Sequence, residues 1–67
     1  MELKINGDVI TVEDNNKTVE HVIAHLGLEA KSLIVEHNQH ILKKEEHPET
    51  LVTDGDRLEI VHFVGGG

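Results

Sequence analysis

Three consecutive glycines, Gly65, Gly66 and Gly67, close the sequence directly after an apolar run at residues 60–64. Glycine has no side chain to pack and loses more backbone freedom on folding than any other residue, so we expect a flexible tail here. The apolar run indicates a strand that anchors this tail. A terminal carboxylate on such a bare segment suits an enzyme that draws a chain end through a narrow channel. A frayed chain end is the alternative that the three glycines by themselves leave open.

Histidines are the other candidates for chemistry. His21 and His25 are four residues apart, which places them on one face of a helix at a spacing that metal ligands use. The chain has no cysteine and the sequence places no third ligand, so we expect solvated helix surface and no metal site. His37, His40 and His47 fall on predicted strand ends and a loop, with no nucleophile arranged beside them. We therefore expect no catalytic histidine and no metal cofactor.

The composition indicates one small acidic domain. The 67 residues include 13 acidic and 6 basic side chains, for a formal net charge of -7. This balance disfavours nucleic acid and anionic membranes as partners and favours a basic surface on a protein. Phe63 is the single aromatic residue, which argues against base stacking. No apolar stretch is long enough to span a bilayer and no signal peptide is apparent, so we expect a cytoplasmic protein, monomeric when free.

The hydrophobic pattern predicts five strands and one helix. Asn6-Gly7 is the strongest two-residue hairpin signal, because a type I′ turn needs positive φ at both positions. Thr18 is a good N-cap, and apolar residues at i, i+3, i+4 and i+7 follow it. Gly27 stands where a helix-ending glycine belongs. The expected strands cover residues 2–6, 10–12, 33–35, 40–42 and 57–62, and the expected helix covers 19–26.

This order of elements predicts an α+β fold of two layers. Only a sheet can bury the apolar stripe of the single main helix, so we expect a mixed sheet of about five strands with that helix on one face. The last strand can complete the sheet by lying in its centre, parallel to the first. The domain then covers residues 1–64, and the glycine tail covers residues 65–67.

Strand alternation also predicts an exposed docking surface. If Leu58 and Ile60 point at the helix, then Ile34 and Val61 point to the other face of the sheet, where no second helix is available. Phe63 and Val64 continue this strand toward the tail. We expect partner docking on these four apolar residues, with Glu36 and Glu59 at the rim of the patch.

The whole chain resembles the ubiquitin-like sulfur carriers, which have the β-grasp fold, and among them the ThiS family of thiamine biosynthesis. The resemblance rests on the turn Asp54-Gly55-Asp56 before the last strand and on the run from Ile60 to Gly67. Phe63 and Val64 stand where ubiquitin has basic residues before its two glycines, which speaks against a protein modifier.

The resemblance implies a mechanism as well as a fold. A ThiF-like adenylating enzyme would activate the carboxylate of Gly67 with ATP. A persulfide sulfur donor would then convert it to a thiocarboxylate, which delivers sulfur to thiazole synthase for thiazole formation. The chain would be a carrier and co-substrate of these enzymes, with no catalytic residue, no cofactor and no enzyme activity of its own. Two alternatives stay open at this point: the small subunit of molybdopterin synthase, and a ubiquitin-like modifier of other proteins.

Overall fold

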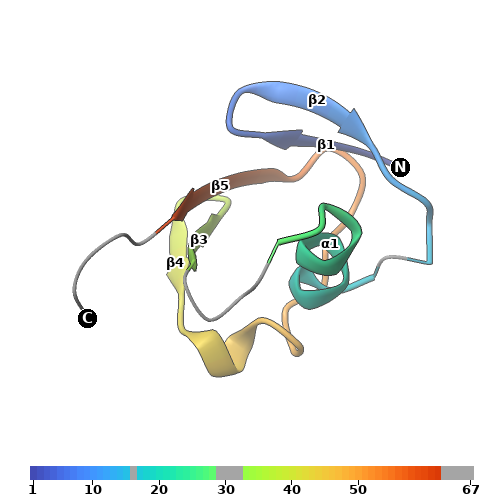
Figure 1. The fold of residues 1–67 in the computed structure, drawn as a ribbon. Coiled ribbons are helices and arrows are strands. Elements are labelled where there is room, and N and C mark those ends of the chain that lie inside the picture. Colours follow the sequence, from blue (N-terminus) through green and yellow to red (C-terminus); the bar gives the residue numbers. More distant parts are fainter. Residues whose placement is uncertain (16, 29–32, 63–67) are drawn as a thin grey trace.

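A five-stranded mixed sheet curves around a single α-helix (Figure 1). The computed structural model describes residues 1–15, 17–28 and 33–62. Its elements are β1 (Glu2–Ile5), β2 (Asp8–Thr11), α1 (Val19–His25), β3 (Leu33–His37), β4 (His40–Leu42), the short 3-10 helix η2 (Lys44–Glu46) and β5 (Arg57–His62). The strand order is β2-β1-β5-β3-β4, with β5 parallel to β1 and antiparallel to β3. The predicted fold class and the central place of the last strand are therefore confirmed.

Both hairpins turn through two residues with positive φ. Asn6 (φ 51°) and Gly7 (φ 87°) connect β1 to β2, as the Asn-Gly signal predicts. Asn38 (φ 47°) and Gln39 (φ 74°) connect β3 to β4 without any glycine. Such a φ is uncommon outside glycine, and asparagine is one of the side chains that adopt it most readily.

The start of α1 has a partner for each of its first backbone N–H groups. Thr18 is the N-cap, as predicted, and its Oγ1 accepts a hydrogen bond of 3.2 Å from the backbone N–H of His21. The two helical N–H groups before that one donate to the backbone carbonyls of Thr50 and His47, at 2.9 and 3.0 Å. The segment after η2 is thereby joined to the beginning of the helix.

The helix ends at His25, one residue before the predicted end, because Leu26 serves as the C-cap. Gly27 (φ 75°) and Leu28 then donate their N–H groups back to carbonyls of the last turn, at 3.0 and 3.1 Å. This pattern of paired bonds is the Schellman motif, which requires a left-handed residue at the position of Gly27. None of the helices in the described residues is long and apolar enough to cross a membrane.

The core fills the space between α1 and the face of the sheet that curves around it (Figure 1). The predicted helix stripe points inward, with Val19, Val22 and Ile23 buried. The sheet and its connections supply the other buried apolar side chains, which are Leu3, Ile5, Val12, Val35, Leu42, Val52, Leu58 and Ile60. Within residues 1–15, 17–28 and 33–62, α1 covers one face of the sheet and no element covers the opposite face, which we call the open face.

The side chain of Asn6 continues the pairing of β1 with β5 beyond the end of β1. Lys4 and Ile5 are the β1 residues in register with β5. Past them, Asn6 Nδ2 donates to the carbonyl of Ile60 at 3.0 Å, and the N–H of Ile60 donates to Asn6 Oδ1 at 2.7 Å. One residue thus makes the first turn and also supplies two hydrogen bonds to the outer half of β5.

We expect Leu58→Ala to lower the free energy of unfolding by about 2–5 kcal/mol, because it leaves a cavity at a side chain that is 1% exposed. Val61→Ala on the same strand is the matched control, and it should cost less than about 1 kcal/mol, since Val61 is 57% exposed. Urea unfolding followed by circular dichroism measures both. Equal losses for the two variants would contradict the assignment of the two faces of β5.

Candidate functional site

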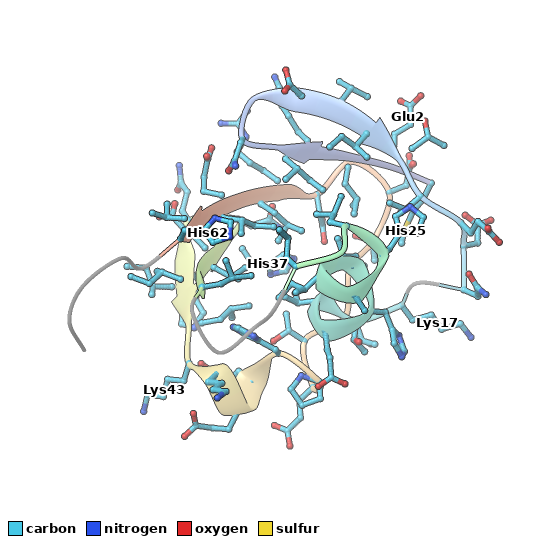
Figure 2. All side chains as sticks on the ribbon, in the orientation of Figure 1. Glu2, Lys17, His25, His37, Lys43 and His62 are labelled. Carbon is cyan, nitrogen blue, oxygen red and sulfur yellow. The ribbon has the colours of Figure 1, made fainter. Side chains whose placement is uncertain are left out.

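The strand that leads toward the C-terminus is β5, and it ends on the rim of the sheet. Figure 2 shows His62 at this end, on the opposite side of the molecule from His25. The predicted reacting group at Gly67 and the predicted tail at Gly65 and Gly66 lie outside the described residues. The predicted docking residues Phe63 and Val64 lie outside them as well.

The structure places the other docking residues together on the open face of the sheet. Ile34 of β3 lies directly opposite Val61 of β5 in the antiparallel register. These two side chains are 43% and 57% exposed, whereas Val35 and Leu58, which point at the helix, are buried. The predicted direction of Ile34 and Val61 away from the helix is therefore confirmed, and a third aliphatic, Ile41 of β4, joins them with 64% exposure.

Glu36 and Glu59 form the row of side chains next to Ile34 and Val61 on the open face. They lie directly opposite each other on β3 and β5, and Ile41 follows Glu36 in the same row. The row formed by Ile34 and Val61 lies next to it on the side of the C-terminus. Both carboxylates are half-buried, because neighbouring side chains on a sheet face cover one another.

A row of opposite charge lies on the other side of the two carboxylates. Lys4 of β1 is in register with Arg57 of β5, and Val9 of β2 is in register with Lys4. The side chains of Lys4 and Arg57 are both exposed on the open face. Sequence reasoning missed this row, because only the parallel register of β1 and β5 brings together residues 53 positions apart in the chain.

The histidines do not gather into a site. His21 and His25 are exposed on α1, as the sequence predicts. Within residues 1–15, 17–28 and 33–62, no group of three or more histidine, cysteine, aspartate or glutamate side chains is placed to hold a metal ion. The residues of the open sheet face are therefore the candidates for binding that the structure offers near the end of β5.

Asp56 accepts hydrogen bonds that join two turns of the chain, the turn between β3 and β4 and its own turn before β5. His37 Nε2 lies 2.8 Å from its carboxylate, and Asn38 Nδ2 donates to it at 3.2 Å. The backbone N–H and the hydroxyl of Thr53 donate at 2.9 and 3.0 Å. Burial acts to raise the pKa of Asp56, but the hydrogen bonds from His37, Thr53 and Asn38 outweigh it and lower the pKa to about 2. This network fixes the start of β5.

His47 is buried, with 2% exposure, although it follows a charged connector and precedes a proline. Its Nδ1 has no hydrogen-bond partner among the described residues. Burial lowers the pKa of His47, and the nearby carboxylates of Glu20 and Glu46 oppose that shift only in part. Sequence reasoning placed His47 on a loop and found no signal for burial, because the contact depends on the packing of residues 44–50 against the start of α1.

Comparison with known proteins gives a consistent result over the whole chain. The model of the ThiS family matches residues 2–67. The chain is 42% identical over 65 residues to the sulfur carrier protein ThiS of Bacillus subtilis, and the alignment covers 97% of this chain and 98% of that protein.

A crystal structure of the thiamine biosynthesis protein ThiS from Geobacter metallireducens matches with a TM-score of 0.85 and 35% identity, over 100% of both chains. This match confirms the ubiquitin-like β-grasp fold. The chain is also 40% identical over 67 residues to a thiazole synthase of Paramagnetospirillum magneticum, where all of this chain aligns with 20% of the length of the larger protein.

We expect Asp56→Asn to destabilise the domain by about 1–2 kcal/mol at neutral pH, because the variant loses the charge that four donors stabilise. The folded carboxyl has a lower pKa than the ordinary 3.8, so its contribution is complete above that value and declines as the pH falls toward about 2. Unfolding by urea at about pH 5 and about pH 3 measures this decline. The exposed Asp8→Asn is the control, and an equal decline in wild type and Asp56→Asn would refute the role of the network.

His47 should produce a second, separate pH dependence. The folded state holds it neutral with a lowered pKa, while the unfolded chain protonates it near the ordinary 6.5, so stability should decrease as the pH falls below that value. His47→Leu should keep the domain folded and reduce this decrease, whereas the exposed His40→Gln should retain it. Thermal unfolding between neutral and mildly acidic pH provides the comparison. An unchanged pH profile in His47→Leu would show that other groups cause it.

Proposed function

Because the chain belongs to the ThiS family of sulfur carriers in thiamine biosynthesis, we propose that its Gly67 carries the sulfur as a thiocarboxylate. The observation that supports this most directly is the match of the family over residues 2–67, which includes all three terminal glycines. The family match also favours the thiamine pathway over the small subunit of molybdopterin synthase and over a protein modifier.

A carboxylate needs activation before sulfur can replace its oxygen. A ThiF-like adenylating enzyme supplies this when the Gly67 carboxylate attacks the α-phosphate of ATP and pyrophosphate leaves. The terminal sulfur of a persulfide donor then attacks the acyl carbon, and AMP leaves. A thiol then attacks the donor sulfur of the resulting acyl disulfide, forms a new disulfide with the donor and releases the thiocarboxylate. The enzymes perform each step, and this chain presents the reacting group.

The division of the chain into a domain at residues 1–64 and a tail at residues 65–67 belongs to this proposal. The domain binds the partner, and the tail reaches the active site. The absence of side chains at Gly65 and Gly66 lets the backbone enter a narrow channel. ATP and persulfide chemistry take place in the reducing interior of the cell, so we place the protein in the cytoplasm.

The docking surface consists of Ile34, Val61, Phe63, Val64, Glu36 and Glu59. Ile34 and Val61 support it, since both are exposed on the strands that border the path of the chain toward the tail. An exposed apolar group beside a reactive chain end is typical of an interaction site. The thiazole synthase relative, in which a segment like this chain forms one fifth of the protein, supports thiazole synthase as a partner.

Mass spectrometry of the protein isolated from cells tests the proposed function directly. A carrier shows a mass increase that corresponds to the replacement of one oxygen by sulfur at the C-terminus. Adducts on lysines of other proteins would instead identify a modifier. Copurification with the large subunit of molybdopterin synthase would place the chain in that pathway.

Deletion of Gly67 should abolish adenylation and leave the unfolding midpoint nearly unchanged. The shortened chain ends one residue, or about 3.5 Å, short of the position of the Gly67 carboxylate, and a near-attack distance of about 3–3.5 Å does not tolerate that additional gap. Gly66→Val should also fail, because the side chain obstructs the channel and restricts φ. ATP–pyrophosphate exchange with the purified adenylating enzyme measures both variants. Exchange at the wild-type rate after deletion of Gly67 would exclude its carboxylate as the reacting group.

A further inference from the structure

Two carboxylates lie directly opposite each other in the centre of the open sheet face. The N–H of Asn38 donates to the carbonyl of Arg57 at 2.9 Å, so the alternation of an antiparallel pair makes Glu36 and Glu59 a hydrogen-bonded pair as well. The Cα atoms of such a pair are about 5.5 Å apart, with both side chains on the same face. The sheet therefore presents two acceptor groups at a spacing that its backbone determines.

This arrangement does not serve the stability of the free domain. Like charges directly opposite each other on a sheet are destabilising. The ion pairs found among the described residues join the N-terminal amine to Asp14 and His37 to Asp56, and neither includes Glu36 or Glu59. Lys4 and Arg57 lie in the neighbouring row, but within the described part of the chain neither forms an ion pair with these two carboxylates, so both carboxylates are available to a cation of a partner.

The surroundings of the two carboxylates favour a cation that arrives on a protein surface. Ile34 and Val61 lie on one side of them and Ile41 lies at the edge strand. When a partner covers these aliphatic side chains, it removes water from the carboxylates and strengthens their attraction to a cation. A hydrated metal ion gains nothing from aliphatic neighbours, whereas a side chain on an apolar surface does.

We propose that Glu36 and Glu59 together bind one arginine guanidinium of thiazole synthase by accepting hydrogen bonds from it. This inference rests on the proposed function. Guanidinium is planar, carries five donors and pairs with carboxylates in a fork geometry, so one such group can bond to both. A lysine ammonium offers a more strongly hydrated point charge and matches two separated carboxylates less well. Thiazole synthase is the partner that we infer, because one thiazole synthase relative contains a segment like this chain within its own polypeptide.

The neighbouring basic residues restrict the orientation in which the partner can bind. Lys4 and Arg57 lie beside the two carboxylates on the side away from the C-terminus. A partner that docks in the reverse orientation brings its arginine against these two cations, which is repulsive. The order basic, acidic, aliphatic along β5 therefore selects the single orientation in which the chain end points at the active site.

Binding of purified thiazole synthase to the unmodified carrier by calorimetry tests the proposal. Glu36→Gln and Glu59→Gln should each raise Kd about 5–20-fold, and the double variant Glu36→Lys with Glu59→Lys should raise it more than about 100-fold. Because both carboxylates contact one guanidinium, the double Gln variant should deviate from the product of the two single effects. Glu49→Gln removes the same charge from the exposed turn after η2 and should leave Kd unchanged.

The two single variants Glu36→Gln and Glu59→Gln should each be more stable than the wild type. Each single Gln substitution removes the repulsion between opposite carboxylates and should raise the thermal midpoint by about 1–5 °C. Weaker binding by a more stable domain separates loss of the contact from misfolding. An unchanged Kd in both Gln variants, or independent effects of the two, overturns the shared guanidinium.

Two further outcomes also decide against the proposal. If the Lys variants bind thiazole synthase normally but raise the KM for the carrier in ATP–pyrophosphate exchange, the pair serves the adenylating enzyme instead. If sedimentation shows that the wild type self-associates and the Lys variants do not, a second copy covers this face. Failure of the proposed function is recognised separately, because the mass of the wild-type C-terminus then shows no sulfur.

Discussion

The central position of β5 is the constraint on which the rest of this structure depends. Its start is held by Asp56 and the turn at Asn38, and its outer half is held by the side chain of Asn6. Parallel pairing with β1 on one side and antiparallel pairing with β3 on the other leave one direction in which the chain can leave the sheet. A carrier needs this, because the place where the chain leaves the sheet has to be fixed relative to the proposed docking surface.

The side chains of β5 point alternately into the core and onto the open face of the sheet. Leu58 and Ile60 point at α1 and hold the domain together, while Glu59 and Val61 point outward and are available to a partner. A small domain with one helix can bury only one face of its sheet, so the second face is open without any further cost in structure. Binding residues and core residues therefore alternate, and they can change independently.

Stability is not maximised in this chain. Glu36 and Glu59 lie directly opposite each other on the open face, an arrangement of like charges that is generally unfavourable on a sheet. His47 is buried with a nitrogen that lacks a partner among the described residues. Marginal stability makes features of this kind significant, since a domain of this size has only a few kcal/mol in reserve. Where unfavourable charges lie on the surface near the end of β5, interaction with another protein is the physical reason that we favour.

Local patterns in the sequence determined most of the fold, because they act between residues close in the chain. Asn6-Gly7 predicted a turn with positive φ, Thr18 predicted the start of the helix, and strand alternation predicted which way Ile34 and Val61 point. The three terminal glycines indicated the family.

The tertiary structure alone decided which distant residues meet. The parallel register brought Lys4 beside Arg57, and the antiparallel register placed Glu36 opposite Glu59. Packing against α1 buried His47, because register and packing depend on the whole sheet and no local pattern records them.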